Sequence, residues 1–272
     1  MTAGTPEGAG VGGTVIRIAA VGDVHCSKTN QGSLLPIFAA ANDMADVLIL
    51  CGDLTDYGYP EEARNLVVQL APVKIPILAV LGNHDYESGN AEEVKKILTD
   101  ARVRVLDGDA VEILGVGFAG VKGFGGGFGR RTLEPWGEDA TKAFVQEAVS
   151  EALKLESALA RLRTPQRVAV LHYSPIEATV EGEPREIFPF LGSGRLEEPL
   201  NRYGVVAAFH GHAHRGAPEG RTSAGIPVYN VALPVLRRTL SEQLPLKIVE
   251  VPVPEPVAIG ESVPSRRRDD PQ

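Results

Sequence analysis

Short apolar runs and amphipathic segments alternate along the N-terminal third of the chain. Runs that are apolar at successive positions are typical of strands covered on both faces of their sheet. Helices are predicted from near Ser33, from Pro60 and after Asn90, because Asn caps helices and Pro and acidic residues favour the first turn. This order predicts parallel α/β units. The predicted strands lie at 15–21, 47–50 and 75–81.

The middle of the chain has a different pattern. Residues 101–121 contain short strand-like runs separated by tight turns, which predicts an antiparallel meander. Apolar residues then recur at three- and four-residue steps over 138–163, which predicts one long amphipathic helix. The remaining predicted strands lie at 167–171, 205–209, 226–232 and 246–251.

Composition is that of a globular protein, with 43% hydrophobic and 23% charged residues among 272. Residues 1–13 are rich in Gly, and residues 259–272 are polar with no apolar periodicity, so both are expected to be disordered tails. Neither a repeat nor a linker interrupts the region between them. A single domain is therefore predicted over residues 14–258.

Charge and cysteine content narrow the function classes. The net charge of −8 disfavours nucleic acid as a partner. Cys26 and Cys51 each follow an apolar run, which favours reduced core residues over a disulfide. The start of the chain lacks the features of a signal peptide, and the apolar runs are far shorter than the ~20 residues that cross a bilayer. We therefore expect a cytoplasmic protein with no membrane partner.

Clusters of Asp, Asn and His follow five of the predicted strands, and all six histidines lie in them. Ligands of open α/β sheets bind outside the carboxyl ends of the strands, so the clusters should converge. Imidazole suits Zn and Fe, and carboxylate or amide oxygens suit Mn. The set is too large for one tetrahedral zinc and fits two bridged ions, with a single ion or none as the alternative. The clusters are Gly22-Asp23-Val24-His25, Gly52-Asp53-Leu54-Thr55-Asp56, Gly82-Asn83-His84-Asp85, His172 and His210-Gly211-His212-Ala213-His214.

The order of these clusters resembles the calcineurin-like metallophosphoesterase superfamily. Asp-x-His, Gly-Asp-x-x-Asp, Gly-Asn-His-Asp, a single His and Gly-His-x-His follow one another over residues 22–214. The resemblance implies an α/β fold in which two central mixed β-sheets pack as a sandwich flanked by helices, in four layers. It also implies a metal-dependent phosphoric ester hydrolase with two Mn, Fe or Zn ions.

The resemblance also implies roles for individual residues. Asp53 would bridge the two ions. His84 would contact the phosphate, together with Asn83, and protonate the leaving oxygen. His210 matches no ligand, so we expect it to be buried. The implied ligands are Asp23, His25, Asp53 and His214 for one ion and Asp53, Asn83, His172 and His212 for the other.

Two further groups are weaker candidates. Asp85 could orient His84, although an ordinary turn aspartate is an equal alternative. The Gly-rich loop 120–137 could face the substrate, with Arg130 and Arg131 binding phosphate and its aromatic residues stacking on a ring. A surface connection before the long helix is the alternative for that loop.

The favoured function is a phosphodiesterase that cleaves a P–O bond of a small phosphorylated substrate with a metal-bridging hydroxide. The Gly-Asp-Leu-Thr-Asp block and the Pro-Glu-Glu helix resemble bacterial phosphodiesterase branches of the superfamily. Members of the superfamily with a ferric–tyrosinate centre carry Tyr at the position of Asp56, so such a centre is not expected here. A phosphomonoesterase or nucleotidase, a metal-binding interaction module without turnover, a nuclease and a metal-dependent C–N hydrolase are the alternatives. The sequence does not determine the oligomeric state, and a homodimer is one alternative.

Overall fold

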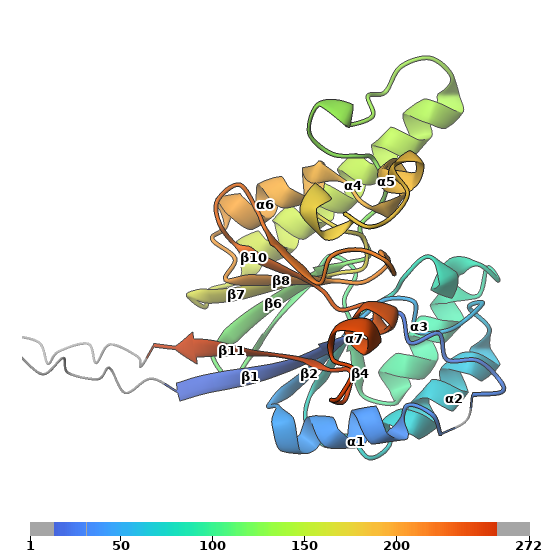
Figure 1. Ribbon diagram of the computed structural model, residues 1–272, viewed down its shortest axis with the longest axis vertical. Helices are drawn as coiled ribbons and strands as arrows, with labels where there is room; N and C mark the ends of the chain where they lie inside the picture. The colour runs from blue at the N-terminus through green and yellow to red at the C-terminus, as the bar shows by residue number, and fades with distance from the viewer. Residues whose placement is uncertain (1–13, 31, 255–272) are drawn as a thin grey trace, which may run out of the picture.

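The computed structural model describes residues 14–30 and 32–254, which form two β-sheets packed face to face with helices on both outer sides (Figure 1). Both sheets are mixed, with five and six strands. The fold class implied by the resemblance is therefore confirmed. The tails expected at 1–13 and 259–272 lie outside the described residues.

The first sheet is built from the N-terminal α/β units and closed by the C-terminal strand. Its strands are parallel except for the last one in sequence, which pairs antiparallel with the first. In spatial order the strands are β11 (Lys247–Val253), β1 (Thr14–Val21), β2 (Val47–Cys51), β3 (Ile77–Val80) and β4 (Val103–Val105). The helices between them are α1 (Leu35–Met44), α2 (Pro60–Leu70) and α3 (Ala91–Asp100).

The second sheet contains four parallel neighbours at its centre, β6, β7, β8 and β10, and one antiparallel strand at each edge. In spatial order it comprises β5 (Asp109–Ile113), β6 (Val116–Val121), β7 (Gln166–Leu171), β8 (Ala207–His210), β10 (Pro227–Asn230) and β9 (Glu219–Arg221). The helices of the chain after β6 are α4 (Asp139–Arg161), α5 (Phe188–Leu191), α6 (Glu197–Arg202) and α7 (Leu233–Thr239). The 3₁₀ turns are η1 (His84–Tyr86), η2 (Gly129–Arg131), η3 (Glu177–Thr179), η4 (Arg185–Ile187) and η5 (Gly194–Leu196).

The antiparallel meander predicted over 101–121 is correct only for its second half. β4 lies in the first sheet, parallel to β3, because α3 carries the chain back before β4 begins. β5 and β6 form an antiparallel hairpin. Its turn is Leu114-Gly115, with φ of 51° and 81°, the left-handed pair that suits a two-residue hairpin turn.

The predicted long helix is observed as α4, with Ala148, Leu155 and Leu159 on its buried face as expected. Glu151 lies in the same buried face. Its carboxylate accepts hydrogen bonds from the Gly123 main-chain N–H and the Lys154 ammonium, both at 2.7 Å. These bonds compensate the burial of the charge and attach the start of the loop after β6 to the helix.

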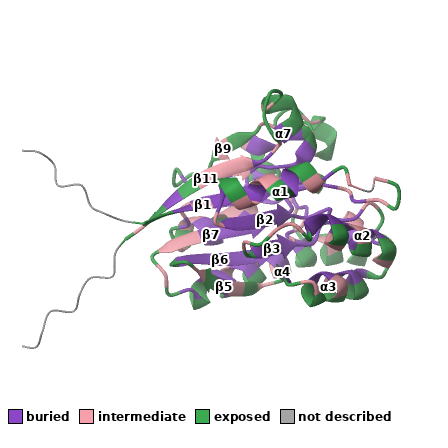
Figure 2. Ribbon diagram, turned by 90° about the horizontal axis from the view of Figure 1, so that it is seen from below, coloured by how far each residue is buried: buried purple, intermediate pink, exposed green. Residues whose placement is uncertain are grey.

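Apolar residues of the two sheets form a continuous core, seen as the buried strands of Figure 2. β2 and β3 contact β6 and β7 across the interface between the sheets. This packing places the carboxyl ends of β1, β2 and β3 next to those of β7 and β8, where the Asp, Asn and His clusters follow. Within the described residues, no helix combines the length and the apolar character that a bilayer crossing requires.

Candidate metal centre

The first group of candidate ligands joins the two sheets. Asp23 and His25 follow β1, Asp53 follows β2, and His214 belongs to the turn after β8; one ligand atom from each lies within 4.8 Å of the others. Main-chain bonds hold the two N-terminal turns together, from Asp23 N to Gly52 O at 2.9 Å and from His25 N to Asp53 O at 3.0 Å. Residues far apart in sequence therefore form a candidate site for one ion.

The second group shares a residue with the first. Asp53 lies within the same 4.8 Å limit of His172, which follows β7, and of His212. The Asn83 Oδ1 lies 2.9 Å from His172 Nε2, so Asn83 belongs to this group as well. The shared Asp53 carboxylate is what a bridge between two ions requires.

Four of the candidate ligands have left-handed backbone. The φ angles are 52° at Asp23, 40° at His25, 46° at Asp53 and 67° at His212. Such conformations cost about 1–2 kcal/mol for residues with a side chain, and they cluster at functional sites. Strand ends with ordinary geometry would direct these side chains elsewhere.

Glycines beside the candidate ligands allow the ligand-bearing turns to approach one another closely. A Cβ at Gly52, where φ is 80°, would lie 2.3 Å from His172 Nδ1, and one at Gly211 would lie 2.1 Å from Asp23 Oδ2. Any larger residue at either position would collide with a candidate ligand. The Gly-Asp and Gly-His pairs of the sequence thus have a steric cause.

The hydrogen bonds of His172 provide a test of whether the site suits a cation. Its Nδ1 lies 3.0 Å from the Cys51 carbonyl, which accepts hydrogen bonds only, so Nδ1 carries the proton. Burial holds the pKa of His172 well below its ordinary value, so the ring is neutral. The Nε2 lone pair then faces Asn83 Oδ1 at 2.9 Å and Asp53 Oδ1 at 3.4 Å. His172 Nε2, Asn83 Oδ1 and Asp53 Oδ1 thus face one another with lone pairs and no proton between them. This arrangement suits the binding of a metal ion.

His212 and His25 have the same character, whereas the hydrogen bond to Asp23 raises the pKa of His214 above its ordinary value. His212 Nε2 lies 3.1 Å from the Phe190 carbonyl, which fixes its proton there and leaves Nδ1 free as a ligand atom. Both ring nitrogens of His25 are buried without a hydrogen-bond partner. Burial, opposed by the Asp53 charge, lowers the pKa of His25 to about 4, and burial together with His172 lowers that of His212 to about 3. Neutral imidazoles are the form that binds metals.

Asp23 is the buried carboxylate at the centre of the first group. Its oxygens accept hydrogen bonds from His212 N at 2.9 and 3.0 Å, and His214 Nε2 lies 2.8 Å away. Burial raises the pKa of Asp23 to about 6, because the His214 hydrogen bond compensates only part of the desolvation and the Asp53 charge adds to it. Two carboxylates this close favour a bound cation.

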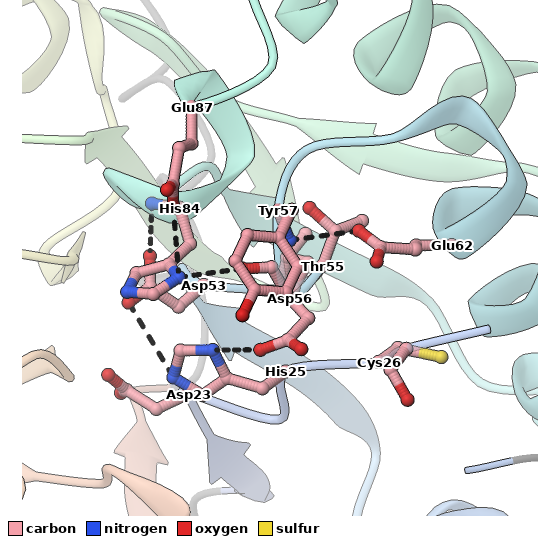
Figure 3. A network of polar contacts seen from close by, with 12 residues as sticks. Asp23, His25, Cys26, Asp53, Thr55, Asp56, Tyr57, Glu62, His84 and Glu87 are labelled. Atoms are coloured by element: carbon pink, nitrogen blue, oxygen red, sulfur yellow. Dashed lines mark hydrogen bonds and ion pairs between the residues drawn. The ribbon is translucent and has the colours of Figure 1, made fainter. Parts of the chain in front are cut away.

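The His84 ring lies beside that of His25, near Asp53 and Asp56 (Figure 3), and its side chain is 34% exposed. Its main-chain N–H donates to Asp53 Oδ1 at 2.9 Å, and its Nδ1 lies 2.7 Å from the Asp56 carbonyl, so Nε2 is left for another partner. The ring centroid is 4.6 Å from that of His25. Burial lowers the pKa of His84, but the Asp56 carbonyl and the charges of Asp53 and Glu87 raise it above its ordinary value.

Asp85 was a candidate for orienting His84, but its carboxylate hydrogen-bonds to other groups. It accepts hydrogen bonds from the main chain of Leu54, Thr55 and Gly82 and from the Thr55 hydroxyl, at 2.6 to 3.2 Å. These bonds join the turns after β2 and β3. In this geometry the Asp56 carbonyl orients the His84 ring, and Asp85 supports the loop that carries Asp53.

The loop 120–137 divides into two parts. Its first half packs on the protein: Phe128 is buried, and Gly126 N donates to the Pro189 carbonyl at 2.7 Å. Arg130 and Arg131 lie in the exposed turn η2, and within the described residues no hydrogen bond or ion pair joins their side chains to the candidate ligands. Phosphate binding by these two arginines stays a prediction.

Several supporting groups carried no clear sequence signal. The carbonyls of Asp56 and Phe190 act through main-chain atoms, which every residue has. His210 is fully buried, as expected; its Nδ1 donates to the Gly211 carbonyl at 2.7 Å, and the Thr179 hydroxyl lies 2.8 Å from its Nε2. The histidine pattern pointed to His210 as a residue of interest, but nothing pointed to Thr179.

Comparisons with solved structures agree with this architecture. The phosphopantetheinyl hydrolase of Mycobacterium tuberculosis superposes with a TM-score of 0.61 at 16% identity, over 85% of this chain and 95% of that one. GAP50, an anchor in the inner membrane complex of Plasmodium, gives 0.52 at 13% identity, over 81% and 72%. At these identities the likeness concerns the fold. No curated protein matches by sequence.

The sequence itself also matches a family. The model of the calcineurin-like phosphoesterases aligns with residues 16–216, which include every candidate ligand described above. This stretch is well over half of the 272 residues. The chain therefore belongs to the calcineurin-like phosphoesterase family.

Proposed function

We propose that this protein is a dinuclear metal-dependent phosphodiesterase that acts on a small phosphorylated substrate. The observation that carries the proposal is the position of Asp53, whose carboxylate belongs to both groups of candidate ligands. Asp23, His25 and His214 would complete one site, and Asn83, His172 and His212 the other. Two bound ions would supply charge neutralisation and activation of water, with Mn, Fe and Zn as the candidates.

The chain's own residues would position the substrate and handle a proton. His84 is held by its main-chain bond to Asp53 and its ring bond to the Asp56 carbonyl. Its free Nε2 would hydrogen-bond a phosphate oxygen and donate a proton to the departing oxygen. The Asn83 amide, beside it in sequence, would be shared between the second site and the phosphate.

Charge around the centre favours diesters over monoesters. A diester carries one negative charge, whereas a monoester is close to a dianion at neutral pH. In the described part of the chain, the Asp23 and Asp53 carboxylates have histidines and no Lys or Arg as ion-pair partners. Arg238 donates to the His214 main-chain carbonyl, at 3.2 Å. The lack of a Lys or Arg partner at the two carboxylates supports the less charged ester, although the charge of Lys122 also acts on His172.

The test is hydrolysis of bis(p-nitrophenyl) phosphate and p-nitrophenyl phosphate, side by side, by metal-stripped protein reloaded with Mn²⁺. We expect faster turnover of the diester and loss of both activities on chelation. Turnover of the monoester alone would favour a phosphatase. Two bound metals with no turnover of either ester would favour the interaction module.

A further inference from the structure

A connected group of aromatic side chains extends from the candidate metal centre to the surface. The Tyr173 ring centroid lies 4.4 Å from that of His212 and 5.8 Å from that of Phe124. Phe124 lies 4.8 Å from Phe144, which lies 5.9 Å from Phe190. We name Phe124, Phe144, Tyr173 and Phe190 the aromatic cluster. It begins beside a candidate ligand and ends at Phe190, which is 57% exposed.

Main-chain bonds fix the outer end of the aromatic cluster. The Phe190 carbonyl accepts from His212 Nε2 at 3.1 Å, so the backbone that carries the ring is tied to the metal centre. On the other side, Gly126 N donates to the Pro189 carbonyl at 2.7 Å. The short helix α5 is therefore held between the centre and the loop 120–137, and its exposed ring has a defined position.

The aromatic cluster is tightly packed from its outer end to its inner end. A Cβ at Gly125 would lie 2.6 Å from the Pro189 carbonyl and 3.1 Å from the Phe144 ring, so glycine permits the contact of loop and helix. The Lys122 ammonium lies 4.8 Å from the Phe124 centroid and 5.4 Å from that of Tyr173, in cation–π contact with both. A rigid base thus supports an exposed apolar ring.

We propose that the exposed face of Phe190 is a subsite for a planar aromatic group of the substrate ester. This inference rests on the proposed function and adds a substrate class to it. The Phe190 ring is exposed to water, and the main-chain carbonyl of the same residue contacts the candidate ligand His212. The inference is that an aromatic group esterified to a phosphate at the metals reaches this ring, where it would gain stacking and apolar burial.

Binding of two phosphonates tests the subsite without turnover, because a P–C bond is not hydrolysed. Benzylphosphonate and methylphosphonate share the headgroup and differ in the ring, and below their second pKa both carry the single negative charge of a diester. Their dissociation constants would be measured by calorimetry on Mn²⁺-loaded protein, for the wild type, for Phe190→Ala and for Leu153→Ala. Leu153 is the matched control, an exposed apolar residue of α4 that lies outside the aromatic cluster.

We expect benzylphosphonate to bind the wild type and Leu153→Ala about three- to tenfold more tightly than methylphosphonate. Phe190→Ala should lose most of this preference and retain its metals, because the main-chain carbonyl that contacts His212 remains. Equal affinities in the wild type, or a preference that survives Phe190→Ala, would overturn the subsite alone. Metal-loaded protein that binds neither phosphonate would instead overturn the proposed phosphate site, and the subsite with it.

Discussion

The His172 ring is surrounded by acceptor oxygens, from Cys51 on one nitrogen and from Asn83 and Asp53 on the other. Without a cation, the Nε2 lone pair and the Asp53 carboxylate repel each other in a buried site. A cation between them converts the same contacts into bonds. Affinity for metal and instability of the metal-free protein therefore have one structural cause.

Asp53→Asn separates these two effects. The amide is a poor bridge, so we expect the variant to lose both metals. In chelator, however, it should be more stable to urea than metal-free wild type by about 1–2 kcal/mol, because its N–H₂ can donate to His172 and the repulsion with Asp23 disappears. Asp43→Asn, an exposed aspartate of α1, is the matched control and should change neither property. Retention of two metals by Asp53→Asn would contradict the shared-ligand arrangement.

His84→Ala tests the proton-donor role. The structure also groups His84 with His25 and Asp56, but neither of the two groups that share Asp53 contains it, so we expect the variant to keep two metals by elemental analysis. Its turnover of a diester should fall about 10²- to 10⁴-fold, the usual contribution of a general acid. Added imidazole should restore part of the loss. Full activity in His84→Ala would exclude this role.

Elements differ in how far their placement could be predicted. The first three strands and helices of the chain were predictable because β2 and β3 are continuously apolar and α2 begins with Pro and Glu. β4 was not, because its three residues, Val-Arg-Val, alternate like an edge strand of either sheet. The candidate ligands follow from side-chain types at strand ends, whereas the main-chain contacts of Asp56 and Phe190 have no residue signature.

Between elements, a buried chain of hydroxyls joins η3 to the end of β8. The Ser174 and Thr179 hydroxyls lie 2.8 Å apart, and the Thr179 hydroxyl reaches His210 at 2.8 Å. Thr179→Val leaves the buried His210 Nε2 unpaired, so we expect a loss of about 1–3 kcal/mol in urea unfolding. Thr99→Val, at an exposed position of α3, is the control and should cost less than about 0.5 kcal/mol. Equal losses in the two variants would show that Thr179 has no special part.

For the whole molecule, the centre connects the two sheets. Asp23, His25, Asp53 and Asn83 come from the first sheet, and His172, His212 and His214 come from the second. Each bound ion stabilises the native state by about 2.7 kcal/mol at a hundred times its dissociation constant. Chelation should therefore lower the Tm of wild type by at least about 5 °C in calorimetry. Asp53→Asn should show no such shift, and a metal-independent Tm in wild type would contradict a centre that spans both sheets.

The sequence distance between the two ligand sets also has a consequence during synthesis. Asp23, His25 and Asp53 leave the ribosome early, whereas His214 follows 161 positions after Asp53. At about 5–20 residues per second, the nascent chain displays an incomplete set of ligands for on the order of ten seconds or more. β11, which pairs with β1, emerges later still. Acquisition of the full complement of metal would thus be a late event in the life of each new chain, after both sheets have come together.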